Sequence, residues 1–147
     1  MVQHVDLSRY GGKWYEIARL PTRFEKGCRC VTAEYTERKN FIEVKNSCTE
    51  GKGSEAKTHS ITGKAFSTSE PGKLKVQFFW PFKADYWIIA LDSSYQYAMV
   101  GHPNREYLWI LSRTPQLDET VVQKLTEQAK SQGFETAKLE WTVQEGC

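Results

Sequence analysis

The most reactive side chains in this sequence belong to four cysteines and three histidines. The cysteines, Cys28, Cys30, Cys48 and Cys147, form an even set but lack the closely spaced pairs of a zinc site, so we expect no metal centre. Cys147 is the final residue of the sequence, where a cysteine is well placed to tie a tail to the body of the protein. Such a bond needs an oxidising compartment, so the cysteines predict disulfides and export from the cytosol.

Catalytic patterns are missing around the histidines. His4 and His59 lie in no known motif, and His102 falls in a Gly-His-Pro-Asn stretch that is typical of a hairpin turn. The sequence also lacks a glycine-rich phosphate loop. One alternative stays open: Cys48 has the same strand parity as Ile42 and Val44, so an interior thiol could act as a nucleophile. We otherwise predict no enzyme activity, no catalytic residues and no cofactor.

Length and charge limit the classes of protein to which this chain can belong. The 147 residues correspond to a single domain, residues 1–147, with a formal net charge of +2. Lysine and arginine are interspersed with aspartate and glutamate, which argues against nucleic acid as a partner. The sequence shows neither a membrane-spanning stretch nor a signal peptide, because Asp6, Arg9 and Lys13 follow soon after Met1. With export expected, the sequence would begin at the mature N-terminus.

Short runs with the alternation of half-buried strands recur along the chain. Residues 73–80 show it best, with Leu74, Val76, Phe78 and Trp80 on one face. Residues 49–60 are polar and are expected to form a loop or a weak edge strand. The expected strands cover residues 14–20, 30–36, 42–47, 59–66, 73–80, 86–91, 95–100, 107–111 and 138–143.

One strong helix is expected, over residues 115–133, with Asp118 as its N-cap and Gly133 as its stop. The strands at 86–91, 95–100 and 107–111 are apolar on both faces, so an element must cover their outer side, and the helix can do so. A meander of short strands followed by one helix favours an all-β, antiparallel up-and-down barrel with a C-terminal α-helix packed on its outside.

Three patches resemble the signature segments of the lipocalin family. Gly12-Lys13-Trp14 resembles its Gly-x-Trp motif, Ala90-Leu91-Asp92 its second segment, and Ser112-Arg113-Thr114-Pro115 its third. They occur in the family's order, and the closest likeness is to bacterial outer-membrane lipocalins and apolipoprotein D. The resemblance implies an eight-stranded barrel that carries a small hydrophobic molecule, in the cell envelope or outside the cell. The lipid-bearing N-terminal cysteine of the bacterial branch is not found in this sequence.

The resemblance also assigns roles to particular residues. Trp14 and Arg113 match the pair that closes one end of a lipocalin barrel, with the guanidinium over the indole, so their role is expected to be structural. A prostaglandin-isomerising lipocalin uses a cavity thiol, and Cys48 could resemble it. This keeps a lipid-modifying enzyme as the alternative function.

Binding is the leading prediction for the barrel interior. An apolar wall with tyrosine hydroxyls suits a fatty acid, a lysophospholipid or a similar lipid, for transport or storage. A tetrapyrrole carrier is a second alternative, although His59 is the single histidine that could face inward. Trp80-Pro81-Phe82 beside Lys83 could touch a membrane surface. The expected ligand-binding residues are Val31, Ala33, Tyr35, Ile42, Val44, Leu74, Val76, Phe78, Trp80, Tyr107, Trp109 and Trp141.

Four cysteines allow three complete pairings. Strand parity turns Cys30 outward, where a tail could pass, and apolipoprotein D has matching cysteines, so we predict a Cys30–Cys147 bond. A hairpin turn near Asn40 brings Cys48 close to Cys28, which favours a Cys28–Cys48 bond if a bulge follows Asn46. We expect a monomer or a weak homodimer.

Overall fold

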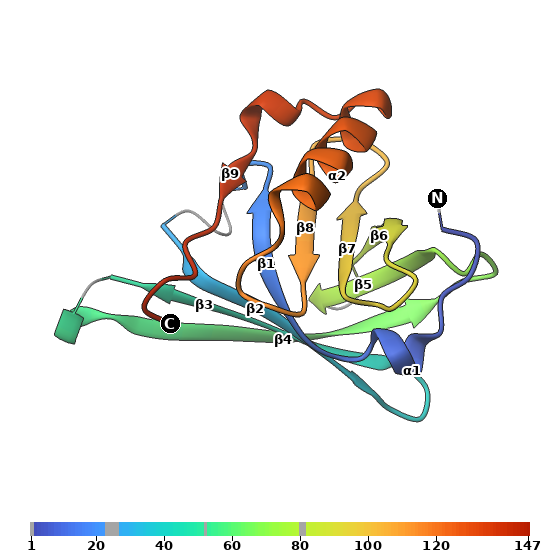
Figure 1. The fold of residues 1–147 in the computed structure, drawn as a ribbon. Coiled ribbons are helices and arrows are strands. Elements are labelled where there is room, and N and C mark those ends of the chain that lie inside the picture. Colours follow the sequence, from blue (N-terminus) through green and yellow to red (C-terminus); the bar gives the residue numbers. More distant parts are fainter. Residues whose placement is uncertain (1, 23–26, 52, 80–81) are drawn as a thin grey trace.

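The structure is a computed structural model that describes residues 2–22, 27–51, 53–79 and 82–147 (Figure 1). Its centre is a closed antiparallel barrel of eight strands, as predicted. Consecutive strands are hydrogen-bonded neighbours, and β1 pairs with both β8 and β2, which closes the sheet on itself. The strands are β1 (Gly12–Arg19), β2 (Arg29–Glu37), β3 (Ile42–Glu50), β4 (Lys57–Ser67), β5 (Lys73–Phe79), β6 (Phe82–Leu91), β7 (Tyr97–Gly101) and β8 (Leu108–Ser112).

The remaining elements lie before, between and after these strands: α1 (Leu7–Tyr10), the short 3₁₀ helix Gly53–Glu55, α2 (Glu119–Ser131), a second 3₁₀ helix Thr136–Lys138 and β9 (Glu140–Trp141). Asp118 caps α2 by accepting a hydrogen bond from the Thr120 N–H, and Gly133 follows the helix with a φ of +95°. Both helix signals in the sequence are therefore confirmed. No helix among the described residues has the length and hydropathy of a transmembrane segment.

Two apolar cores share the strands β6, β7 and β8. Ala98 and Val100 of β7 point into the barrel, whereas Met99 between them points outward and packs with Leu125 and Ala129 of α2. Figure 1 shows α2 lying over the outer side of β7 and β8. This arrangement confirms that strands with two apolar faces need an outer cover, and that the helix supplies it.

The barrel has two ends, which we name by what lies there. At the α1 end, α1 packs into the interior core through Tyr10, and β1 begins. The opposite end, which we call the distal end, is where β1 finishes at Arg19 and where β2 begins at Arg29.

A C-terminal tail, residues 140–147, completes the barrel wall at the distal end. β1 pairs with β2 through residues 12–15, but farther along β1 the partners of Ala18 and Arg19 are Trp141 and Glu140. The side-chain amide of Gln144 then donates to the carbonyls of Glu16 in β1 and Val31 in β2. The tail thus lies between two strands that have separated. The expected strand at 138–143 is shortened to two residues because residue 138 still belongs to a 3₁₀ turn.

Several strand boundaries differ from the sequence prediction. The polar stretch 49–60, expected as a loop or a weak edge strand, belongs to strands at both ends, because β3 runs on to Glu50 and β4 begins at Lys57. The start of β4 was missed because every residue from 57 to 62 is exposed and no alternation marks it. β6 begins at residue 82 instead of 86. β7 begins at Tyr97, because Tyr95 takes a left-handed conformation, with φ of 58°, inside the preceding turn.

Candidate functional site: the barrel interior

The half of the interior nearer α1 is filled by side chains. Ala33, Tyr35, Ile42, Val44 and Leu74 belong to one contiguous cluster inside the barrel. Each is buried, as is Val31 on β2. All six were expected to line a ligand cavity. The five in the cluster face inward, and their close packing makes them the floor and wall of the interior, whereas Val31 is buried outside this cluster.

A second group of inward-facing side chains is only half-buried. Val76 and Phe78 of β5, Tyr86 of β6 and Trp109 of β8 pack against the same cluster yet keep part of their surface accessible to solvent. Their inward direction follows from register, since Val76 is paired with the buried Ala65. Solvent-reachable apolar surface inside a barrel is the surface that a hydrophobic ligand can cover.

Three expected ligand residues have other placements. Trp141 is on β9 with 55% of its surface exposed, so its assignment to the cavity is wrong. It pairs with Ala18 at the outer seam, and the next residue, Thr142, turns its hydroxyl inward instead. Tyr107 is half-buried just before β8 and stacks on Trp109, with ring centroids 5.9 Å apart. Trp80 lies outside the described residues.

Three tyrosine hydroxyls meet in the interior, and we call them the tyrosine triad. The Tyr86 hydroxyl lies 2.7 Å from that of Tyr10 and 2.6 Å from that of Tyr35. The three residues come from α1, β2 and β6, so the triad joins distant parts of the chain. The hydroxyls carry three protons for two mutual hydrogen bonds, which leaves one O–H to donate elsewhere.

Burial of the triad suppresses its ionisation. Desolvation raises the pKa of Tyr35 to about 12 and raises the pKa values of Tyr10 and Tyr86 well above the usual value. All three hydroxyls are therefore neutral at physiological pH. Tyrosines were expected as scattered polar groups, but sequence spacing gives no sign that these three converge, because long-range packing alone brings them together.

A buried ion pair lies farther along β1. Glu16 and Arg19 are 3% and 6% exposed, and their charged groups are 2.8 Å apart. Thr142 of the tail donates to the same Glu16 carboxylate at 2.5 Å and accepts from Arg19 at 3.1 Å. The sequence analysis missed this cluster. Glu16 shares the strand parity of Trp14, and that was the available signal for a charged side chain pointing inward.

The α1 end is closed by Trp14 and Arg113. The guanidinium lies 3.8 Å from the centre of the fully buried indole ring. It also donates to the carbonyls of Arg9, Lys13 and Tyr95, so one side chain joins α1, β1 and the turn before β7. The expected placement of the guanidinium over the indole is confirmed, and the structural role of the pair stays a prediction.

Two disulfides, Cys28–Cys48 and Cys30–Cys147, join the pairs expected from the sequence. The expected bulge after Asn46 is wrong, because β3 keeps an unbroken register with β4. The irregularity lies instead in β2, between Arg29 and Thr32, where Cys30 has a φ of 54°. An extra residue there reverses the parity of β2, which turns Cys28 to the face of Cys48.

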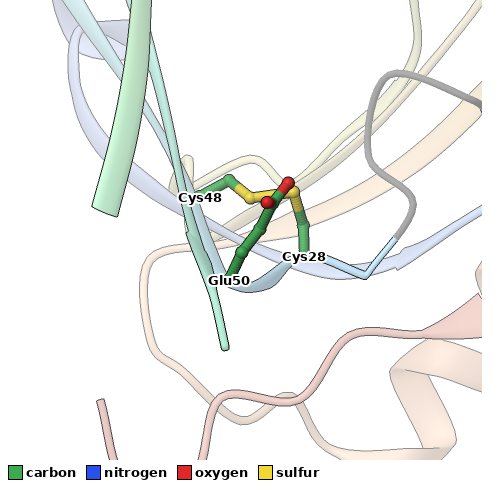
Figure 2. A group of neighbouring side chains, drawn as sticks. All are labelled: Cys28, Cys48 and Glu50. Carbon is green, nitrogen blue, oxygen red and sulfur yellow. A yellow bond between two sulfur atoms is a disulfide. The ribbon is translucent and has the colours of Figure 1, made fainter. Parts of the chain in front are cut away.

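A carboxylate accompanies the first disulfide. Arg29 pairs with Thr49, so Cys28 lies opposite Glu50, and Cys48 is two residues away on the same face of β3. The two sulfurs and a Glu50 carboxylate oxygen lie within 4.8 Å of one another, as Figure 2 shows. Because both sulfurs are bonded to each other, Cys48 offers no thiol for the enzymatic alternative.

A small hollow lies outside the barrel, between the β7–β8 turn and the end of α2. Its volume is about 140 Å³, and Trp87, Arg105 and Phe134 are among its lining residues. Ligand sites for drug-sized molecules occupy roughly 300–1,000 Å³, so this hollow is too small for a lipid. The barrel interior is the better candidate.

Comparison with known proteins gives the family. Residues 5–144 match the family model described as a lipocalin-like domain. The chain belongs to the lipocalin family. This lipocalin is 44% identical to the outer membrane lipoprotein Blc of Citrobacter freundii, over 100% of this chain and 84% of that protein. It is 36% identical to apolipoprotein D of Macaca fascicularis, over 99% of this chain and 80% of that protein.

A solved structure agrees on the fold of this lipocalin. Insecticyanin from the tobacco hornworm Manduca sexta superposes with a TM-score of 0.75 at 23% identity, covering 96% of this chain and 82% of that one. Membership of the family implies that the barrel binds a small hydrophobic ligand. Proteins of this family generally bind or carry molecules rather than transform them.

Proposed function

We propose that this lipocalin binds the acyl chain of a fatty acid, lysophospholipid or similar lipid in the distal half of its barrel, for transport or storage. The observation that carries the proposal is the half-buried inward group Val76, Phe78 and Trp109, together with Tyr86, which pairs with Leu74 at the floor of the site. These side chains offer apolar surface that water still reaches, and covering it with an acyl chain stabilises the complex by about 25 cal/mol per Å².

The packed cluster sets the depth of this site. Ile42, Val44 and Leu74 are each at most 8% exposed, so an acyl chain would end above them. The polar group of the lipid would then lie toward the distal end. An outer-membrane protein among the relatives and two disulfides in this chain support export to the cell envelope or beyond.

The test is to fill the proposed site from within. Val76→Trp adds bulk to the inward face of β5, whereas Lys75→Trp adds the same side chain to the outer face one residue away. Binding would be measured with a fluorescent fatty acid and with a lysophospholipid, displaced by the unlabelled lipids.

We expect the Val76→Trp protein to lose at least tenfold in affinity and the Lys75→Trp protein to bind as the parent does. Equal affinity in both variants would overturn the proposed location. Failure of the parent protein to bind either lipid would overturn the proposed ligand class.

A further inference from the structure

A cluster of metal-ligating side chains lies at the distal end, at β2, β3 and β4, which contribute none of the half-buried side chains of the proposed lipid site. Cys28 precedes β2, Cys48 and Glu50 are on β3, and His59 is on β4. His59 is the cross-strand partner of Cys48, and its Nε2 atom lies 3.9 Å from a Glu50 carboxylate oxygen. We propose that, when the Cys28–Cys48 disulfide is reduced, these four residues bind a zinc ion.

The reduction step needs a thiol reductant and balances without other reagents. Two thiol molecules give two electrons and two protons to the Cys28–Cys48 bond, leaving two cysteine thiols and one disulfide of the reductant. A zinc ion then displaces one proton from each thiol as the two sulfur–metal bonds form. Two protons are released to solvent for each ion bound.

The geometry of the cluster suits zinc. Typical bond lengths of about 2.3 Å to sulfur and about 2.0–2.2 Å to nitrogen or oxygen separate the ligand atoms of a tetrahedral site by roughly 3.3–3.8 Å. The sulfur and carboxylate atoms already lie within 4.8 Å of one another (Figure 2). Side-chain rotations of about 1 Å at the ligand atoms therefore complete three ligands while the β2–β3 ladder stays in place.

His59 lies where its imidazole can supply the fourth ligand. Its side chain is 58% exposed, so rotation toward the sulfurs breaks no packing. Two thiolates, one imidazole and one carboxylate form a ligand set that zinc commonly accepts.

Charge is conserved when the metal takes the place of the covalent bond. The oxidised cluster carries one negative charge, on Glu50. Two thiolates, the carboxylate and a divalent ion also sum to one negative charge. The three strands at this end are therefore joined in either redox state, by a covalent bond between β2 and β3 or by an ion that also reaches β4.

The test uses the full chain, reduced and kept free of oxygen, with Co²⁺ as the spectroscopic probe and Zn²⁺ as the competitor. We expect one metal ion per chain, a sulfur-to-cobalt charge-transfer band and the visible bands of tetrahedral cobalt. The oxidised protein should show neither the sulfur-to-cobalt charge-transfer band nor the visible bands of tetrahedral cobalt. Affinity should rise with pH because protons are displaced.

Matched variants separate this site from ordinary thiol chelation. Cys28→Ser with Cys48→Ser should abolish the bands, whereas Cys30→Ser with Cys147→Ser should keep them. Glu50→Gln and His59→Gln change exposed side chains and should each weaken Zn²⁺ binding roughly tenfold or more, since even outer partners of a metal ligand cost 10–100-fold.

Three results would overturn the proposal. They are a reduced parent protein that binds no metal, bands that persist without Cys28 and Cys48, and an affinity that neither Glu50→Gln nor His59→Gln changes. The last result would mean that two thiols alone hold the ion.

Discussion

The hydroxyl of Tyr86 holds the tyrosine triad together, because both hydrogen bonds of the triad involve it. Tyr86→Phe keeps the ring but leaves the hydroxyls of Tyr10 and Tyr35 without this partner inside an apolar barrel. We expect a loss of about 1–3 kcal/mol in the free energy of unfolding, measured by urea titration.

Tyr35→Phe is the matched control for that substitution, because it leaves the Tyr10–Tyr86 hydrogen bond in place. Its cost should be smaller, about 0.5–1.5 kcal/mol. If Tyr35→Phe destabilises the protein as much as Tyr86→Phe does, the hydroxyl of Tyr86 has no special role in the triad.

The raised pKa values of the triad predict a loss of stability at alkaline pH. Unfolded tyrosines ionise near pH 10, whereas Tyr35 in the fold ionises only at a pKa of about 12. The folded state therefore holds protons that the unfolded state has released. The stabilisation is fully present below pH 10 and falls by up to about 1.4 kcal/mol per pH unit for each tyrosine as pH rises toward the folded pKa.

Absorbance of tyrosinate checks this prediction. The sequence has seven tyrosines, and the three of the triad should ionise only well above pH 10 or together with unfolding. A single transition near pH 10 that includes all seven, in protein still folded by circular dichroism, would contradict it.

Arg113 joins three segments through one guanidinium, so its loss should affect folding rather than ligand affinity. Arg113→Ala removes the contact with Trp14 and three hydrogen bonds to carbonyls. We expect about 2–4 kcal/mol of destabilisation from the lost cation–π contact and the unpaired carbonyls. Trp14→Ala should cost about 3–5 kcal/mol.

Urea titration and lipid binding on the same samples test that assignment. Arg113→Lys keeps the charge but cannot reach three carbonyls at once, so it should recover only part of the loss. An unchanged unfolding midpoint together with lost lipid binding would show that the pair serves the ligand instead.

At the scale of elements, the C-terminal tail depends on its disulfide. The Cys30 N–H donates to the carbonyl of Val143, and the Thr142 N–H donates to that of Ile17. Without the Cys30–Cys147 bond, these amides should exchange hydrogen faster, because the tail can separate from β1 and β2 locally. The bond closes a sequence separation of 117 residues, worth up to about 4.7 kcal/mol in the chain-entropy model.

The double variant Cys30→Ser with Cys147→Ser tests the tail, and Cys28→Ser with Cys48→Ser is its control. The control bond closes a separation of 20 residues and should contribute about 3 kcal/mol. Hydrogen exchange followed by mass spectrometry should show faster exchange at residues 140–147 in the first variant only. Equal protection of the tail in both would contradict the prediction.

Elements with a regular pattern could be predicted from the sequence, and those set by distant neighbours could not. The alternation of Leu74, Val76 and Phe78 identified β5, and Asp118 and Gly133 delimited α2. The bulge in β2 left no mark, because Cys30 adopts a left-handed conformation that only the tertiary structure requires.

The predicted ligand-binding residues divide in the same way, into features that follow a regular sequence pattern and features that distant neighbours set. Strand parity correctly turned Val76 and Phe78 inward but could not tell packed positions from accessible ones, because that depends on which side chains lie opposite. The assignment of Trp141 to the cavity was wrong, because the tail joins the sheet at the outer seam and leaves the tryptophan side chain exposed.

At the scale of the whole molecule, the two cores should unfold together. Leu125 of α2 is 1% exposed and packs on strands whose other face lines the barrel. Leu125→Ala should lower the free energy of unfolding by about 2–5 kcal/mol. The transition followed by near-ultraviolet circular dichroism of the barrel aromatics should still coincide with the far-ultraviolet transition.

Lys124→Ala is the control at the neighbouring exposed position and should change stability little. If Leu125→Ala separates the two transitions, α2 unfolds independently of the barrel and the cores are not one cooperative unit.

The position of the tail between β1 and β2 also has a consequence for biosynthesis. A ribosome completes Cys30 117 residues before it reaches Cys147, so the distal seam between β1 and β2 stays incomplete throughout that interval. Synthesis at about 5–20 residues per second makes that interval roughly 6–23 seconds. During this time a nascent chain exposes the edges of β1 and β2 beside the buried charges of Glu16 and Arg19. The distal part of this seam can therefore be completed only after residues 140–147 have been synthesised, and the exposed strand edges need protection from aggregation until then.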